Sequence, residues 1–437
     1  MFGGNFMTLA EIKNKIINAI DENKDEIVKI AEQILNNPET GYKEEKTSAL
    51  TRKVFDSLSL PYQYPLAKTA VKATLGEKSD KPNVCIIGEM DALSCNGHPF
   101  ASADGIAHAC GHHAQMAAML GAAIALTKSG VINDLDGNIS FFAVPAEEFI
   151  ELEYRKSLKD EGEISYYGGK QQLISEGAFD DVDMALMLHA QPNEEKANVY
   201  VRGYNLGFLA KTITFRGKAA HGSKPFEGTN ALNAAALSLI GIHSNRDTFK
   251  EEDRIRIHPI ITKGGDVVNS IPDEVCIETY VRGATFEAIK KGNDAVMRSV
   301  NGAAQMIGAT VDVEDVPGYL PLSESLELSE VFENICKEVI GNDALIYNEP
   351  VTGSSDIGDL SYVLPTIQPS IGGFSGNLHG KEFVASNKET AYVLSAKLLA
   401  LTAAELLYDG AKKAKAVKES FKPQMTKDEY MNYLKGE

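Results

Sequence analysis

The chain has 437 residues with 43% hydrophobic content, which is enough for a large core and too long for one comfortable domain. Its net charge of −18 argues against nucleic acid and membrane surfaces as partners, because both bind clustered lysine and arginine. Five scattered cysteines, no apolar run of the roughly 18 residues that span a membrane, and an N-terminus without a secretion-signal pattern together indicate a cytoplasmic protein.

The chain opens with a predicted helix. Thr8 and Glu11 have the spacing of a capping box, and apolar residues follow at helical intervals to about Asn37. Pro38 breaks this pattern, and residues 44–58 predict a second helix.

Short apolar runs at residues 83–88, 138–144 and 183–188 predict strands that are buried on both faces. The alanine-rich stretch 116–128 predicts a helix between the first two strands, and the highly charged stretch 152–162 predicts a surface insertion. Because strands alternate with helices, we expect an α/β fold with a central mixed, mainly parallel sheet flanked by helices.

The pattern changes near residue 208, where alternating strands replace buried ones. Strands are expected at 210–215, 254–262, 274–282 and 309–313, and helices at 230–242 and 285–306. Residues 208–316 therefore form an inserted α+β domain. Residues 1–207 and 317–437 form the other domain, which ends in a helix at 388–407.

Side chains that bind metals or move protons follow the predicted strands, where open α/β sheets place their sites. They are Asp91, Cys110, His112, Glu147, Glu148, His189 and a later histidine in a glycine-rich loop, His379. Taken singly, each has an ordinary explanation as a buried thiol, a turn cap, a solvated loop or a scaffold histidine. Together they supply the thiolate, imidazoles and carboxylates of a zinc-like site. The adjacent glutamates suit one ligand and one base toward a metal-bound water.

These motifs, in this order, resemble the M20 metallopeptidases, specifically the amidohydrolase branch of that family. The matching stretches are Pro38-Glu-Thr-Gly41, Met90-Asp-Ala-Leu93, His108-Ala-Cys-Gly-His112, Pro145-Ala-Glu-Glu148, Phe215-Arg-Gly-Lys-Ala-Ala-His221, Asn269-Ser-Ile-Pro-Asp273 and Leu378-His-Gly380. The stretches 177–183 and 353–361 are similar to the aminobenzoyl-glutamate hydrolase and peptidase M20 domain-containing protein 2 subgroup.

The resemblance implies a zinc-peptidase-like catalytic domain that holds two divalent ions, zinc first, with manganese or cobalt as alternatives. It implies that Cys110 bridges the ions, with Glu148 and His379 on one and His112 and His189 on the other. Glu147 would be the general base toward the bridging water.

The resemblance also implies roles for Asp91 and for three residues of the inserted domain. Asp91 would orient a ligand histidine. The ferredoxin-like inserted domain would be a lid and the interface of a homodimer, with His221 reaching the partner's active site. Asn269 and Arg282 would grip the substrate's carboxylate.

Two features depart from the branch. His113 stands where an Asp or Asn usually follows the ligand histidine, and either adds a ligand or changes the hydrogen bonding behind one; we favour the second. The charged insertion 150–167 displaces a glycine-rich run that often follows the glutamate pair in the branch. How substrate enters the site, and which substrate it selects, are therefore questions for the structure.

The expected activity is hydrolysis of the amide bond in small N-acyl or aminoacyl amino acids. The alternative is a metal-binding or regulatory protein of the same fold without turnover, against which the intact Glu147 argues. A serine hydrolase, a His-Glu-x-x-His protease and a P-loop enzyme are excluded, because the chain has no G-x-S-x-G, no His-Glu pair and no P-loop.

Overall fold

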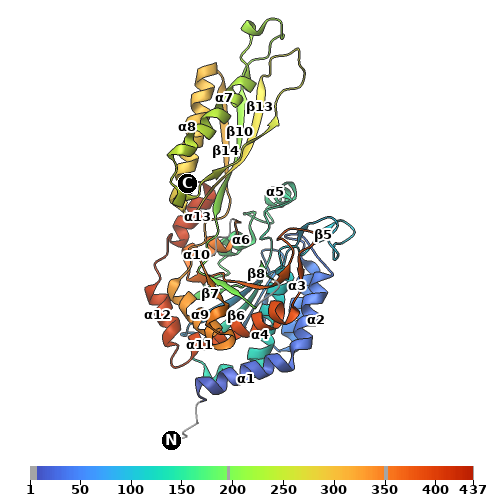
Figure 1. Cartoon of the computed structure of the whole chain (residues 1–437), viewed down its shortest axis with the longest axis vertical. Coiled ribbons are helices and arrows are strands. Elements are labelled where there is room, and N and C mark those ends of the chain that lie inside the picture. The colour runs from blue at the N-terminus through green and yellow to red at the C-terminus, as the bar shows by residue number, and fades with distance from the viewer. Residues whose placement is uncertain (1–6, 194–196, 349–352, 437) are drawn as a thin grey trace. The chain divides into compact units, whose positions relative to one another are not determined.

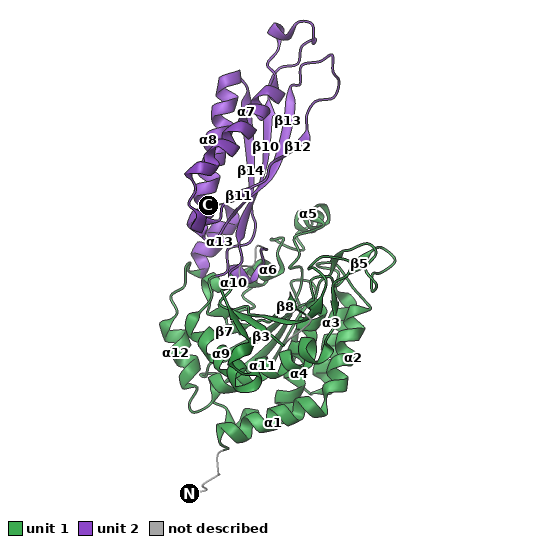
Figure 2. Cartoon of the chain, viewed as in Figure 1, with its two compact units in different colours: residues 1–203, 323–350, 359–426 green, residues 204–322, 351–358, 427–437 purple. Residues whose placement is uncertain are grey.

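The computed structural model describes residues 7–193, 197–348 and 353–436. The chain forms two compact units, shown in green and purple in Figure 2. Unit 1 comprises residues 1–203, 323–350 and 359–426, and unit 2 comprises residues 204–322, 351–358 and 427–437. The expected inserted domain lies within unit 2, which also takes in two later segments of the chain.

The central sheet of unit 1 has six strands in the order β1-β2-β6-β3-β7-β16. Their bounds are Tyr62–Leu66, Ala70–Leu75, Asn138–Val144, Asn83–Glu89, Met184–Leu186 and Thr366–Ile367. β3 runs parallel to β6 and β7, and β16 runs parallel to β7. β2 is antiparallel to both of its neighbours, β1 and β6. The predicted α/β class with a mixed, mainly parallel sheet is confirmed.

A second sheet of unit 1 has the order β15-β9-β17-β18, with β8 paired to β17. Its strands are Leu345–Tyr347, Val199–Val201, Ser370–Ser375, Val384–Ala385 and, for β8, His189–Pro192; a separate ladder joins Leu93–Ser94 (β4) to Ile106–Ala107 (β5). His189 therefore begins a strand of this second sheet, and does not simply follow the central strand as expected. The chain changes sheet between β7 and β8, and this brings the histidine beside β17.

Unit 1 also contains helices. Their bounds are Leu9–Glu22 (α1), Lys24–Leu35 (α2), Glu45–Ser57 (α3), His112–Lys128 (α4), Leu152–Asp160 (α5), Gly169–Ser175 (α6), Leu326–Ile340 (α9), Ile357–Val363 (α10), Ser395–Leu407 (α11) and Lys412–Ser420 (α12). Of these, α3, α4, α9 and α11 contact strands of the central sheet. α4 packs on β3 and is contacted by α1, α2 and α11, as Figure 1 also shows. Nearly all residues of α4 are buried, as expected for a helix with no polar face.

The prediction of one opening helix to about Asn37 is wrong, because the helix is interrupted at Asn23, between α1 and α2. The capping box forms as expected, with the Glu11 N–H donating to Thr8 Oγ1 at 3.3 Å and the Thr8 N–H donating to Glu11 Oε2 at 2.7 Å. Asn23 Nδ2 donates to the Ala19 carbonyl at 2.6 Å and so caps the C-terminal end of α1. α2 begins at the next residue, Lys24.

The expected absence of a membrane-length apolar run also needs correction. Glu389–Leu407, a π-helical turn (Glu389–Leu394) continued by α11, is long and apolar enough by composition to cross a membrane. However, 83% of its most apolar window is buried inside the protein. It is a core helix, packed against α4 and α9.

Unit 2 contains an antiparallel sheet of five strands in the order β11-β13-β10-β14, with β12 also paired to β13. The strands are Arg256–Ile257, Glu274–Gly283, Gly207–Arg216, Thr310–Pro317 and, for β12, Ile260–Lys263; the helices are Ala231–Ser244 (α7), Phe286–Ile307 (α8) and Lys427–Lys435 (α13). The strand expected over 254–262 is two short strands, β11 and β12. α7 and α8 pack on β10 and β13, so this sheet buries one face, as its alternating pattern predicts.

Candidate active site

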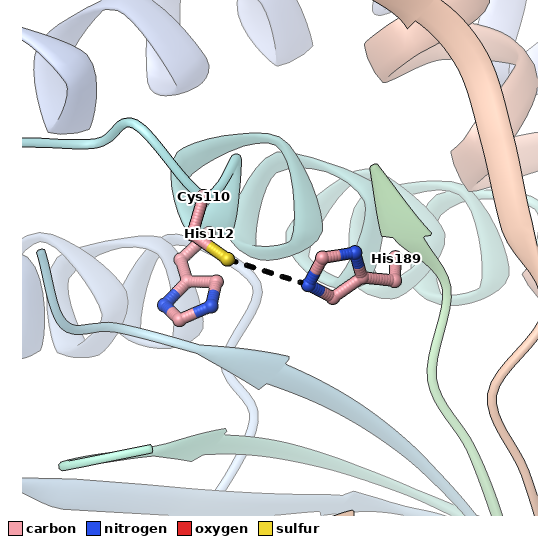
Figure 3. A group of neighbouring side chains, drawn as sticks. All are labelled: Cys110, His112 and His189. Carbon is pink, nitrogen blue, oxygen red and sulfur yellow. Dashed lines mark hydrogen bonds between the residues drawn. The ribbon is translucent and has the colours of Figure 1, made fainter. Parts of the chain in front are cut away.

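The stretch before α4 brings a thiol and an imidazole together. The helix starts at His112, four residues earlier than predicted, because Gly111 adopts a left-handed φ of 89° and turns the chain into it. A Cβ at position 111 would lie 2.5 Å from the Ala190 Cβ, so only glycine fits there. Cys110 and His112 lie on either side of this turn, facing His189 of β8 (Figure 3).

Two groups of side chains have ligand atoms that lie within 4.8 Å of one another. One is Cys110, His112 and His189, and the other is Cys110, Glu148 and His379. Cys110 Sγ is 3.5 Å from His189 Nε2, the interaction drawn in Figure 3, and His379 Nε2 is 3.4 Å from Glu148 Oε1. The sequence-predicted ligands are thus together, and the thiol is common to both groups.

Backbone hydrogen bonds hold the two predicted ligand histidines, His189 and His379, in their orientations. The His189 Nδ1 lies 2.8 Å from the Ala190 carbonyl, which leaves its Nε2 toward Cys110. The His379 N–H donates to the Ala109 carbonyl at 2.8 Å, so the late loop is fastened next to the thiol. His379 has a left-handed φ of 63°, a conformation that this contact helps to hold.

Asp91 connects two of the ligands. The His112 Nδ1 is 2.8 Å from the Asp91 carbonyl and 3.2 Å from its Oδ1. The Asp91 Oδ2 accepts the Glu148 N–H at 2.9 Å. These contacts place the buried Asp91 carboxylate beside the Nδ1 of His112, and its role in orienting that ring stays a prediction.

The charges around Cys110 favour the thiolate. Burial raises the pKa of this thiol, but His112 and His189 outweigh it and hold the pKa well below its usual value. The protonated His379 ring can donate to Cys110 and Glu148, and these acceptors raise the pKa of His379 to about 11. Burial and the negative charge on Cys110 raise the pKa of Glu148 to about 7. The thiolate is the form of cysteine that binds metals.

The residues fit a pair of divalent ions. Within the described part of the chain, the buried atoms His112 Nε2 and Glu148 Oε1 make no well-formed hydrogen bond, although buried polar atoms are nearly always satisfied. Each belongs to a different one of the two groups that share Cys110. Thiolate, imidazole and carboxylate are the donor set of zinc and similar ions.

Glu147 and Glu89 lie next to the ligands. Glu147 is buried, and its Oε2 is 3.9 Å from His112 Nε2. Glu89, at the end of β3, is fully buried with its Oε2 at 3.2 Å from the same nitrogen. Glu89 Oε1 accepts from Lys170 Nζ at 2.5 Å, and Oε2 accepts from Gln115 Nε2 at 2.8 Å.

Sequence reasoning missed the Glu89–Lys170 pair. The signal for Glu89 is a carboxylate at the end of a strand that is otherwise apolar. Lys170 stands on α6, with nothing around it in the sequence to suggest a fully buried ammonium. Glu89, His112 and Glu147 form a third close group of ligand-type side chains.

His113 lies away from both ligand groups and contacts other aromatic side chains. Its Nε2 is 3.2 Å from the Tyr392 hydroxyl, and its ring stands 5.6 Å from that of His108. Both histidines are buried, and burial lowers the pKa of His113 to about 3. His113 is in neither of the two ligand groups that share Cys110, and its effect on hydrogen bonding behind the predicted ligands stays a prediction.

The other three predicted residues belong to unit 2. His221 is exposed and forms an isolated bridge with Ser270, next to Asn269, whose carbonyl accepts the Gly222 N–H at 2.7 Å. Arg282 stands on β13, half-buried. It lies over Phe208 and Tyr280, and its Nη1 donates to Ser354 Oγ at 2.7 Å.

Comparison with known proteins adds the family. The model of the family described as Peptidase family M20/M25/M40 matches residues 85–405. The human Xaa-Arg dipeptidase is 28% identical over 96% of this chain and 94% of its own, and the Arabidopsis thaliana IAA-amino acid hydrolase ILR1-like 4 is 26% identical over 82% and 80%.

Two solved structures share the fold. A dinuclear metal-binding M20 peptidase from Bacillus subtilis has a TM-score of 0.71 at 21% identity, over 88% of this chain and 98% of its own. The aminobenzoyl-glutamate utilization protein from Klebsiella pneumoniae has a TM-score of 0.63 at 18% identity, over 92% and 100%. The family match spans well over half of the chain, so this protein belongs to peptidase family M20/M25/M40, in its amidohydrolase branch, and is a metal-dependent hydrolase of amide or peptide bonds.

Proposed function

We propose that the protein hydrolyses small N-acyl or aminoacyl amino acids, of the dipeptide or aminobenzoyl-glutamate kind, with Glu147 as general base. The observation that supports this most is the pair of ligand groups sharing Cys110, with the buried Glu147 carboxylate beside them. Relatives named as a dipeptidase and an amino acid hydrolase support the substrate class.

The proposed reaction divides the work among the side chains. Cys110, His112, His189, Glu148 and His379 would hold the two ions. When bound, the ions would polarise the scissile carbonyl and lower the pKa of the attacking water. Glu147 would take the proton from that water and deliver it to the leaving nitrogen. Asp91 would keep the His112 ring oriented.

The test of this function is a substrate panel with metal-reconstituted protein, read by mass spectrometry. The panel holds dipeptides ending in arginine, an indoleacetyl amino acid, aminobenzoyl-glutamate and N-acetyl amino acids. We expect cleavage of at least one of them to two products. Full metal content without hydrolysis of any member would instead support the non-catalytic alternative.

The ion-sharing role of Cys110 is tested by Cys110→Ser. A neutral hydroxyl replaces a thiolate that serves both ligand groups, so we expect most of both ions to be lost. The measurement is elemental analysis after mild purification, with about two zinc-like ions per wild-type chain. Cys336→Ser, at a buried cysteine of α9, is the control and should keep the metal. A Cys110→Ser protein with full metal content would make Cys110 an ordinary buried thiol.

The proposed grip on the substrate carboxylate is tested by Arg282→Met. A charge-assisted hydrogen bond contributes about 1.5–3 kcal/mol, so kcat/KM should fall about 10- to 100-fold for a substrate with a free carboxylate. It should change little for the same substrate as its carboxamide. Arg256→Met, at an exposed arginine on the neighbouring strand β11, is the control. An equal loss for both substrates would contradict the assignment.

We also propose that the protein is a cytosolic homodimer that pairs through unit 2. Its cysteines are free, which suits a reducing compartment. β12 is exposed throughout, and among the residues that the structure describes it pairs with β13 and no other strand. Exposed apolar side chains stand on and near it. They are Ile260, Ile261, Val267 and Val268. A strand edge with such side chains is a common place for a second copy to pair.

A further inference from the structure

The charged insertion contains a side chain that does not belong to a surface. α5 is highly charged, and Lys156, Lys159 and Asp160 are exposed. Arg155, in the middle of the same helix, is 1% exposed and is among the largest fully buried side chains of the described residues. An arginine cannot lose its proton in a protein, so its burial requires partners for the guanidinium.

Those partners include backbone carbonyls, two of which belong to the loop that carries the two glutamates. Arg155 Nη1 donates to the Tyr167 carbonyl at 2.7 Å and to the Ala146 carbonyl at 3.4 Å, and Nη2 donates to the Glu148 carbonyl. Ala146 and Glu148 flank Glu147. A single planar guanidinium therefore holds the backbone on both sides of the proposed base.

This backbone needs holding. Ala146 has a φ of 55°, in the left-handed region that residues with a Cβ avoid. Its N–H donates to the buried Glu44 carboxylate at 2.9 Å, and the Glu148 N–H donates to Asp91 Oδ2 at 2.9 Å. The loop is thus bound on its N–H groups by carboxylates and on its carbonyls by Arg155.

The surroundings of the guanidinium are tightly packed. A Cβ at Gly41 would lie 2.5 Å from Arg155 Nη2 and 2.8 Å from the Ala146 Cα. The start of the helix is fastened separately, because Lys43 pairs with Glu151 at 2.9 Å and lies 4.1 Å from the Tyr154 ring centroid. The insertion is therefore joined to the loop 146–148 by hydrogen bonds through Arg155.

We propose that Arg155 is a positioning residue for the hydrolysis. From the inserted helix, it fixes the loop 146–148 so that Glu147 and Glu148 keep the positions their chemistry requires. This inference rests on the roles proposed above for the two glutamates. It gives the insertion a function in the reaction itself, where the sequence indicated an effect on substrate access.

The experiment compares Arg155→Met, Arg155→Lys and Lys156→Met. Lys156 is the neighbouring exposed residue, paired with Asp160 at 2.6 Å within the helix, so its loss should change nothing. For Arg155→Met we expect kcat to fall about 10- to 100-fold with KM nearly unchanged, because small misplacements of reacting groups cost about that much. Arg155→Lys keeps the charge but lacks the planar fork that places two nitrogens on different carbonyls, so it should restore only part of the rate.

Two further measurements do not depend on turnover. Titration of metal-free protein with zinc should show about tenfold weaker binding of one ion in Arg155→Met, because Glu148 is a proposed ligand. Hydrogen exchange of the backbone amides at 146–148 should quicken in the metal-free variant and stay unchanged in Lys156→Met.

The outcomes separate the ideas. A lower melting temperature with unchanged kcat and unchanged exchange would mean that Arg155 only anchors the helix. A change confined to KM would mean that the insertion affects the entry or binding of substrate and not the position of Glu147. Full recovery of kcat in Arg155→Lys would mean that the positive charge alone matters. Quicker exchange and weaker zinc binding in a protein that cleaves no substrate would refute the proposed function while keeping the positioning role. If Arg155→Met does not fold, Arg155→Lys carries the same measurements.

Discussion

Replacing Glu147 with Gln should lower kcat by about 10²–10⁴, the usual contribution of a general base, while both metal ions stay bound. The amide keeps the shape of the side chain and removes its ability to take a proton. Glu147 belongs to neither of the two ligand groups that share Cys110, so metal content should not change. Stopped assays at saturating substrate give kcat, and elemental analysis gives the metal.

The pH dependence provides a second measurement on the same variant. A general base works only when deprotonated, so wild-type kcat/KM should rise with pH through the pKa of the base. Glu147→Gln should lack this rise. Glu153→Gln, at an exposed glutamate of α5, is the control and should retain it.

Glu148→Gln distinguishes the two neighbours. Glu148 lies in a ligand group with Cys110 and His379, so its loss should weaken metal binding first and lower the rate as a consequence. Excess metal should then recover part of the activity, which it should not do for Glu147→Gln. If the two variants showed each other's behaviour, the roles of the glutamates would have to be exchanged.

Replacing His221 with Ala should lower kcat by about 10²–10³, the usual effect of removing one oxyanion donor. His221 Nδ1 accepts hydrogen bonds from the Ser223 N–H at 3.1 Å and its hydroxyl at 2.8 Å. A neutral ring held this way carries its proton on Nε2, which can donate to a developing negative oxygen. His258→Ala, at another exposed histidine of unit 2, is the control.

The distinctive test is complementation between two inactive variants. If His221 serves the partner's active site, a mixed dimer of Glu147→Gln and His221→Ala has one site with both functional groups. Random exchange of equal amounts makes half of the dimers mixed, so about a quarter of all sites should recover. Proven subunit exchange without recovered activity would place the action of His221 within its own chain, or nowhere.

The family, the fold class and the grouping of the candidate ligand side chains could be predicted from the sequence. Buried parallel strands are continuous apolar runs, so β3 and β6 stand out, and the polar residues at their ends collect at one edge of the sheet. Sequence boundaries were less accurate. At Asn23, one side-chain hydrogen bond separates α1 from α2 although the amphipathic pattern continues through both. At Gly111, a left-handed turn begins α4 at His112, before the apolar stretch that predicted it.

What the sequence by itself determined is the kind of chemistry: a cysteine, histidines and carboxylates at strand ends, in the order of a metal-dependent amidohydrolase. Only the tertiary structure decided how these groups are held. Glu89 meets Lys170 across 81 residues, the Ala146 N–H meets Glu44 across 102, and Arg155 turns inward from a helix that otherwise looks like surface. A charged side chain carries no mark of burial in the sequence, because its burial is stable only when the fold supplies opposite charges and hydrogen-bonding partners from distant parts of the chain.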